Sequence, residues 1–170
     1  DCPAAKSQAL YRSFMDTDAI EAAGATPIRP ALDAIDHAAD KAALTRTIGA
    51  LKPIDMGPDV FDIAVFGDPK NPDTNVVHLE QSGIGLPDEA YYREDHYAPI
   101  REAYVDMVAK QLRLAGYGDE ETTRAQADRF LDVETRIAAN HWDNVATRDS
   151  QKTYNPTDFV TLSDELAHFN

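Results

Sequence analysis

The sequence predicts a mainly α-helical fold, a helical lobe with a long antiparallel helix pair, a small helical cluster and one β-hairpin. Apolar residues recur at helical spacing near both ends of the chain. Between them, over residues 58–81, the apolar period shortens to that of a strand. Because the chain has 170 residues and 43% hydrophobic residues, we expect residues 1–170 to form a single domain with its own core.

Residues 1–57 are expected to form the small helical cluster. Its elements are a helix over 4–15, a short helix capped by Asp16-Thr17-Asp18 and ended by Gly24, a helix begun at Thr26–Pro30, and a helix capped by Asp40 and stopped by Pro53. In the third of these, Leu32, Ile35 and Ala39 are expected to face inward.

Residues 58–81 are expected to form the β-hairpin. The alternating apolar residues are Phe61, Ile63, Val65, Val77 and Leu79. The joining segment 67–74 is dense in turn-forming residues, which predicts a long loop. An isolated strand pair is marginal in water, so it must pack against helices or a further strand.

Residues 82–96 are expected to form a fixed bend that packs as a wedge between layers. Gly83 and Gly85 allow positive φ, and Pro87 restricts the residue before it to extended backbone. The other residues selected here are Leu86, Asp88, Tyr91 and Tyr92. The segment is too apolar for a solvated loop.

Residues 97–142 are expected to form the helix pair. The apolar stripe of its first helix is Ile100, Tyr104, Val108 and Leu112, flanked by Ala103, Met107 and Leu114. Gly116-Tyr117-Gly118 ends that helix, and the second runs from about Asp119 to about His141. The short connection favours antiparallel packing. Residues 143–170 are expected to form a closing loop and a short helix capped by Thr157 or Ser163.

Composition excludes several classes of partner. The net charge of −14 opposes binding to nucleic acid and to anionic membrane surfaces, and its even spread indicates a solvated acidic surface. Cys2 is the one cysteine, so no internal disulfide is expected. The sequence contains no membrane-spanning apolar run, and we expect a soluble segment without membrane contact, cytoplasmic or exported, with the compartment unknown.

Two positions in the second long helix invite a functional interpretation. Glu134 lies beside the apolar stripe and is either a buried acid or metal ligand, with His141 as a second ligand, or a structural partner of an arginine such as Arg148. A metal site needs three or four converging ligands, so the structural role is favoured. Trp142 is expected to cap the core at the helix end.

The loop after this helix carries polar residues that packing alone would not select. They are Arg148, Asp149, Tyr154 and Asn155, followed by Pro156. Either they form a hydrogen-bonded clasp that holds the loop, or they line the wall of a substrate chamber, and the clasp is favoured.

No nucleotide or nucleophile site is supported. Gly83-Ile84-Gly85 lacks a third glycine at the required offset and is followed by Pro87 and acidic residues, which rules out a phosphate loop. Ser82 has no neighbouring His or Asp in a nucleophile context, and Cys2 lies near one end.

Three stretches together resemble a known family. They are Gly85-Leu86-Pro87-Asp88 with Tyr91-Tyr92, the run from His141-Trp142 through Arg148-Asp149 to Tyr154-Asn155-Pro156, and Leu10-Tyr11-Arg12-Ser13-Phe14-Met15-Asp16 with Ala19-Ile20-Glu21 and Gly24. In this order they are similar to the N-terminal, non-catalytic helical lobe of the neprilysin and endothelin-converting-enzyme family of zinc metallopeptidases. The resemblance covers nearly the whole chain and suggests a bacterial member.

The resemblance implies a peptide-hydrolysing parent enzyme and an inactive fragment. Family members hold zinc with a His-Glu-x-x-His helix and a Glu-x-x-x-Asp helix, and no histidine here has a second one four residues on. We therefore expect zinc in the parent, no cofactor in this segment, and no catalytic or metal-binding residue in it. The implied partners are the catalytic lobe of the same chain and peptide substrates.

Two functions follow as hypotheses. Under the first, the chain is the lobe that encloses and size-selects peptides for the catalytic lobe. Under the second, it is a stand-alone helical binding module without protease activity. A third interpretation, in which the chain itself cleaves peptides, predicts bound zinc.

Overall fold

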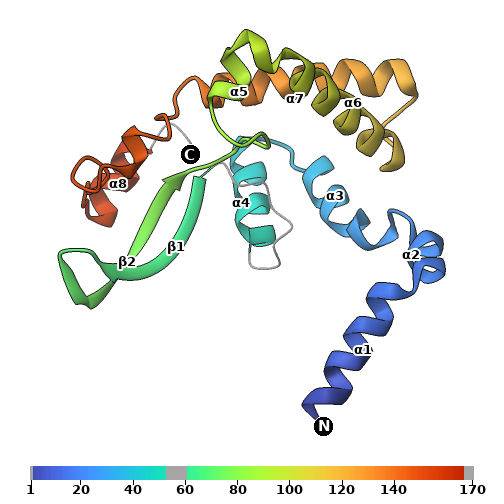
Figure 1. Cartoon of the computed structure of the whole chain (residues 1–170), viewed down its shortest axis with the longest axis horizontal. Helices are drawn as coiled ribbons and strands as arrows, with labels where there is room; N and C mark the ends of the chain where they lie inside the picture. Colours follow the sequence, from blue (N-terminus) through green and yellow to red (C-terminus); the bar gives the residue numbers. More distant parts are fainter. Residues whose placement is uncertain (1, 53–60, 167–170) are drawn as a thin grey trace. The chain divides into compact units, whose positions relative to one another are not determined.

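The computed structural model describes residues 2–52 and 61–166, and it confirms the mainly α-helical class with one antiparallel hairpin (Figure 1). The chain divides into two compact units, Asp1–Ala38 and Ala39–Asn170, which are described separately. The single-domain organisation stays a prediction. Pro53 and the expected strand start at residue 58 lie outside the described residues.

The first unit contains short helices with well-defined boundaries. They are α1 (Pro3–Met15), α2 (Thr17–Ala23), a 3₁₀ turn (Thr26–Ile28) and α3 (Arg29–Asp36). The Asp16 carboxylate accepts the Ala19 N–H at 3.0 Å, which confirms the expected cap. Ala31 is the buried residue of α3, whereas Ala39 is exposed and lies beyond the helix, so its inward placement was wrong. The helix ends at Asp36, before the spacing that placed Ala39 inward could continue.

The second unit begins with α4 (Lys41–Leu51) and the hairpin. The Asp40 carboxylate accepts the Ala43 N–H at 2.7 Å and caps α4 as expected. Strands β1 (Phe61–Asp68) and β2 (Asn71–Gln81) pair antiparallel, with Ile63 opposite Leu79. The long loop predicted over 67–74 is wrong, because pairing continues to Asp68 opposite Asn71 and the extra residues are absorbed in a register shift beside Gly67.

The helix pair forms the core that positions the site. Helix α5 (Ala90–Arg93) and a 3₁₀ turn (Asp95–Tyr97) lead into α6 (Ala98–Leu114), and α7 (Glu120–Ala138) returns beside α6, as Figure 1 shows. The turn between them is a Schellman motif, in which the Tyr117 N–H bonds to the Leu112 carbonyl and Gly116 has φ 88°. Asp119 caps α7 through the Thr122 N–H at 2.9 Å.

The α6 face that contacts α7 is rotated from the predicted stripe. Val105 and Val108 are buried, at 3% and 9% exposure, and pack with Ala127 of α7. Ile100, Met107 and Leu114 of the expected stripe and its flanks are exposed. The predicted stripe followed apolar residues at four-residue spacing, whereas the buried face centres on Val105, one position past Tyr104. The small side chain of Ala127 lets the two helices approach closely.

The chain ends its described part with a short 3₁₀ turn (Ala146–Arg148) and α8 (Phe159–Glu165). The cap of α8 is Asp158, whose carboxylate accepts the Thr161 N–H at 2.9 Å. The expected caps Thr157 and Ser163 were wrong, because an aspartate directly before the first turn satisfies that N–H. No helix in the described ranges, 2–52 and 61–166, has the length and apolarity needed to span a bilayer.

Candidate functional site

Glu134 is the buried acid of α7, at 5% exposure, and its carboxylate joins three segments. One oxygen, Oε2, accepts the Tyr92 hydroxyl at 2.8 Å, and the other, Oε1, accepts the Gly85 N–H at 3.0 Å and the Tyr104 hydroxyl at 3.1 Å. Within the described residues, the acid is held by two phenols and a backbone amide in place of the expected arginine Arg148. We call Glu134, Tyr92, Tyr104 and Gly85 the Glu134 cluster.

The Tyr92 hydroxyl links the bend to this carboxylate. It accepts the Gly85 N–H at 3.1 Å and the Leu86 N–H at 2.9 Å while it donates to Glu134. Burial, together with the hydrogen bond to the Glu134 carboxylate, raises the pKa of the Tyr92 phenol above its ordinary value. Burial and the negative charge of Glu134 also raise the pKa of Tyr104. Both phenols are therefore held as neutral donors.

The two glycines of the bend serve different purposes. Gly83 has φ 84°, the left-handed conformation expected for it. Gly85 is outside the positive-φ glycines, so that expectation was wrong for it. A Cβ on Gly85 would lie 2.0 Å from the Tyr104 hydroxyl oxygen, so this position requires glycine because Tyr104 approaches the backbone.

The rest of the bend packs as the predicted wedge. Leu86 and Tyr92 are buried with Ala138, and Tyr91 stacks on Tyr97 with ring centroids 4.0 Å apart. Pro87 is exposed.

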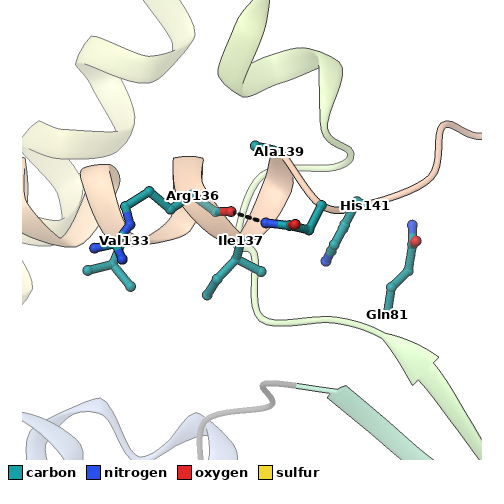
Figure 2. Close-up of a pocket in the computed structure, with 7 residues that line it drawn as sticks. Gln81, Val133, Arg136, Ile137, Ala139 and His141 are labelled. Atoms are coloured by element: carbon teal, nitrogen blue, oxygen red, sulfur yellow. Dashed lines mark hydrogen bonds between the residues drawn. The ribbon is translucent and has the colours of Figure 1, made fainter.

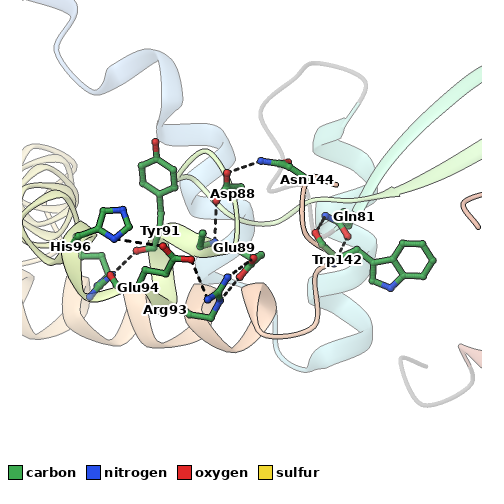
Figure 3. A network of polar contacts seen from close by, with 11 residues as sticks. Gln81, Asp88, Glu89, Tyr91, Arg93, Glu94, His96, Trp142 and Asn144 are labelled. Atoms are coloured by element: carbon green, nitrogen blue, oxygen red, sulfur yellow. Dashed lines mark hydrogen bonds and ion pairs between the residues drawn. The ribbon is translucent and has the colours of Figure 1, made fainter. Parts of the chain in front are cut away.

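Two polar side chains fix this wedge to neighbouring segments. Asp88 accepts the Ala90 N–H at 3.0 Å and the Asn144 side-chain amide at 2.6 Å. The Arg101 guanidinium donates to the carbonyls of Tyr91 and Glu94 at 2.7 and 2.9 Å, which ties α5 to α6. Figure 3 shows Asp88, Asn144 and the Arg93 ion pairs.

The end of β2 is joined to the segment after α7 by a side-chain amide. The Gln81 amide donates to the Trp142 carbonyl at 3.0 Å and accepts the Trp142 N–H at 2.9 Å, as drawn in Figure 3. His141 Nε2 donates to the Ser82 carbonyl at 3.0 Å. The hairpin and the helix pair are thereby held together.

Trp142 does not plug the core, and this expectation was wrong. Its side chain is 45% exposed, because its backbone, locked to Gln81, turns the chain away from α7. Replacing Trp142 by Ala is expected to lower the free energy of unfolding by about 1 kcal/mol or less, since both backbone hydrogen bonds survive. Gln81→Ala, which removes those bonds, is expected to cost more, about 1–2 kcal/mol. Urea unfolding measures both, and the reverse order would contradict the assignment.

The polar loop forms a clasp. The Asp149 carboxylate accepts the N–H groups of Gln151 and Lys152 at 3.1 and 3.2 Å, and the Asn155 amide donates to the Lys152 carbonyl at 2.8 Å. The Tyr154 hydroxyl donates to the Asp68 carboxylate at 3.1 Å, which holds the loop against the hairpin turn. That bond, after the stronger one from the Lys70 N–H, lowers the pKa of Asp68. Arg148 and Pro156 are exposed.

Several residues of the site were missed from sequence. Tyr104 was assigned only to an apolar stripe, and Gln81, Arg101 and Asn144 were not selected. Gln81 ends a strand and Asn144 follows a helix, so their pairing with distant backbone or side chains had no local signal. The chemistry of Tyr104, which has a polar tip that needs a partner when half-buried, was the available signal.

Two hollows lie beside these contacts. An open groove of about 720 Å³ is lined by Gln81, Val133, Arg136, Ile137, Ala139, Asn140 and His141 (Figure 2). A smaller hollow of about 210 Å³ is lined by Gln81, Ser82, Ile84, Leu86, Pro87, Asp88, Glu89, His141 and Asn144. Gln81 and His141 belong to both.

The donor set does not fit a zinc ion. Across residues 2–52 and 61–166, no group of three or more His, Cys, Asp or Glu side chains converges as metal ligands would. Glu134, the buried acid, has all its near neighbours in hydrogen bonds from neutral donors. No reaction step through a metal is derived for these residues.

The raised phenol pKa values predict a loss of stability in alkali. In the unfolded chain tyrosine ionises near pH 10, whereas the folded chain holds Tyr92 and Tyr104 neutral to higher pH, so unfolding releases protons above about pH 10. The free energy of unfolding is expected to fall there, by at most roughly 1.4 kcal/mol per pH unit for each phenol. Tyr104→Phe should make this fall shallower in urea unfolding between pH 8 and 11. Tyr11→Phe, at a ring 64% exposed, is the control, and equal slopes for Tyr104→Phe and wild type would contradict the prediction.

Fold and site together define a helical scaffold whose buried polar cluster connects structural elements. A family model for the N-terminal part of Peptidase family M13 matches residues 2–170, and the chain belongs to this family. This confirms the resemblance stated from the three sequence stretches.

Similar proteins are zinc peptidases by name. The chain is similar to endothelin-converting enzyme 1 of Cavia porcellus, with 28% identity over 88% of this chain and 21% of that protein. It is 30% identical to a putative zinc metalloproteinase of Streptococcus gordonii over 93% of this chain and 28% of that protein. Among solved structures, the Mycobacterium tuberculosis zinc metalloprotease Zmp1 in its open state has a TM-score of 0.86 and 39% identity, covering 95% of this chain and 25% of that one. The chain thus spans about a quarter of these relatives' length.

Proposed function

We propose that this chain is the substrate-enclosing, size-selecting lobe of a neprilysin-like zinc metalloendopeptidase that hydrolyses peptides. Its partners are the catalytic lobe of the same polypeptide and the peptide substrate. Its contribution is to limit access to a chamber and to exclude water from it, while bond chemistry belongs to residues of the other lobe.

The family match over residues 2–170, beside a donor set without converging metal ligands among the described residues, carries this proposal. The buried acid supports it, because Glu134 is engaged by Tyr92, Tyr104 and Gly85 and has no free oxygen directed at a solvent-filled hollow. A lobe that closes over a partner needs internal rigidity, and the cluster supplies it by joining the bend, α6 and α7.

A metal and activity assay tests the division of labour. The purified chain is expected to hold no stoichiometric zinc and to leave a fluorogenic peptide uncleaved. Tightly bound zinc together with peptide cleavage by this chain alone would overturn the proposal.

The flanking reading frame separates the lobe from a stand-alone binding module. Under the proposal, the open reading frame that contains these residues also encodes a His-Glu-x-x-His motif downstream. In the parent protein, a short peptide should be cleaved while the same sequence inside a stably folded protein is spared. A reading frame without the motif would favour the stand-alone module.

A further inference from the structure

The open groove along the end of α7 differs in charge from the rest of the protein. The chain has a net charge of −14, with 30 acidic residues, yet no carboxylate lines this groove. Its ionisable side chains are Arg136 and His141. An acid-free, cationic groove on an acidic protein selects the charge of what binds there.

The geometry of α7 separates this groove from the core. The inward face carries Ala127, Glu134 and Ala138, all buried. Val133 and Ile137, four residues apart, lie on another face, where Val133 is 49% exposed and Ile137 is half-buried. They supply an apolar floor at the groove, as Figure 2 shows.

Polar groups border that floor. The Asn140 amide donates to the Arg136 carbonyl at 2.8 Å, which leaves its side-chain oxygen as an acceptor. His141 and Gln81 are held in place by their bonds to Ser82 and Trp142. Arg136 is exposed in the last turn of α7, where its full charge exceeds the roughly half-unit negative charge of the helix end.

We infer that this groove binds an extended segment of the substrate peptide that carries a carboxylate beside a large apolar side chain. The carboxylate pairs with Arg136, and the apolar side chain covers Val133 and Ile137. The source of the peptide rests on the proposed function, whereas the binding chemistry rests on the groove itself. The groove would add a preference for acidic-apolar peptides at a position remote from the bond that is cleaved.

Fluorescence anisotropy on the purified 170-residue chain tests this inference. The probes are two fluorescein-labelled extended peptides that differ only in Glu or Gln beside a leucine. Wild type is expected to bind the Glu peptide about threefold more tightly, the size of an exposed ion pair, and to lose that preference in high salt. Arg136→Gln should bind both peptides equally, and Val133→Ser should weaken both alike.

Arg129→Gln is the matched control. Arg129 is an exposed arginine two turns earlier on α7, roughly 10 Å along the axis, and does not line the groove. It should retain the wild-type preference. Because Trp142 is the chain's one tryptophan and adjoins groove residue His141, its emission offers a label-free check of occupancy.

Three results would overturn the inference. They are no saturable binding of the Glu peptide, an unchanged preference in Arg136→Gln, and self-association of wild type that Val133→Ser abolishes, which would assign the groove to a second copy. The zinc assay and the reading frame do not involve the groove, so failure of the proposed function is seen separately.

Discussion

Replacing Glu134 by alanine is expected to lower the free energy of unfolding by about 3–5 kcal/mol. Two phenol donors, Tyr92 and Tyr104, would lose a charged acceptor in a site where Glu134 is 5% exposed, at roughly 1.5–3 kcal/mol each. The Gly85 N–H would keep only its longer bond to the Tyr92 oxygen. Urea unfolding followed by circular dichroism measures the change.

Two variants make this measurement specific. Glu134→Gln preserves size but replaces one acceptor oxygen by a donor that faces other donors, so an intermediate loss is expected. Asp132→Asn, at an exposed acid of the same helix, should change stability by about 0.5 kcal/mol or less. A Glu134→Ala loss no larger than that of Asp132→Asn would show that the cluster does not hold the bend to the helices.

Replacing Gly85 by alanine is expected to lower the free energy of unfolding by about 1–3 kcal/mol, the cost of overpacking. The new Cβ would lie 2.0 Å from the Tyr104 hydroxyl oxygen and 2.9 Å from Cζ, so Tyr104 must move and release Glu134. In a double-mutant cycle, Gly85→Ala should cost less in a Tyr104→Phe background, because the nearest clashing atom is absent there.

Other glycines of the chain provide the controls. At Gly49 in α4 a Cβ would meet nothing within 4 Å, so Gly49→Ala should stabilise the protein by about 0.5–1 kcal/mol. Gly83→Ala should destabilise through its φ of 84° alone, with no coupling to Tyr104. Additivity between Gly85→Ala and Tyr104→Phe would contradict the proposed clash.

Much of the fold could be predicted because its signals are local. Asp16, Asp40 and Asp119 cap helices by accepting an N–H three residues later, and such contacts can be read from a short stretch of sequence. The same holds for the turn at Gly116 and for the alternation that predicts the hairpin. The cap of α8 was misassigned between nearby candidates, although the helix itself was expected.

The contacts that fail local prediction are those between distant segments. Trp142 was expected in the core because large aromatic residues usually bury, but two bonds to Gln81, 61 residues earlier, set its backbone direction. The α6 stripe was displaced because the position of α7, not the α6 sequence, decides which side of α6 is covered.

The sequence by itself determined the family, the helical class, the bend and most helix ends of this protein, since each depends on residues within a few positions of one another. Only the tertiary structure decided that Glu134 accepts from Tyr104, Tyr92 and Gly85, at separations of 30, 42 and 49 residues. A carboxylate beside an apolar stripe can face water, an arginine or a phenol, and the segments that fold against it determine which partner it meets.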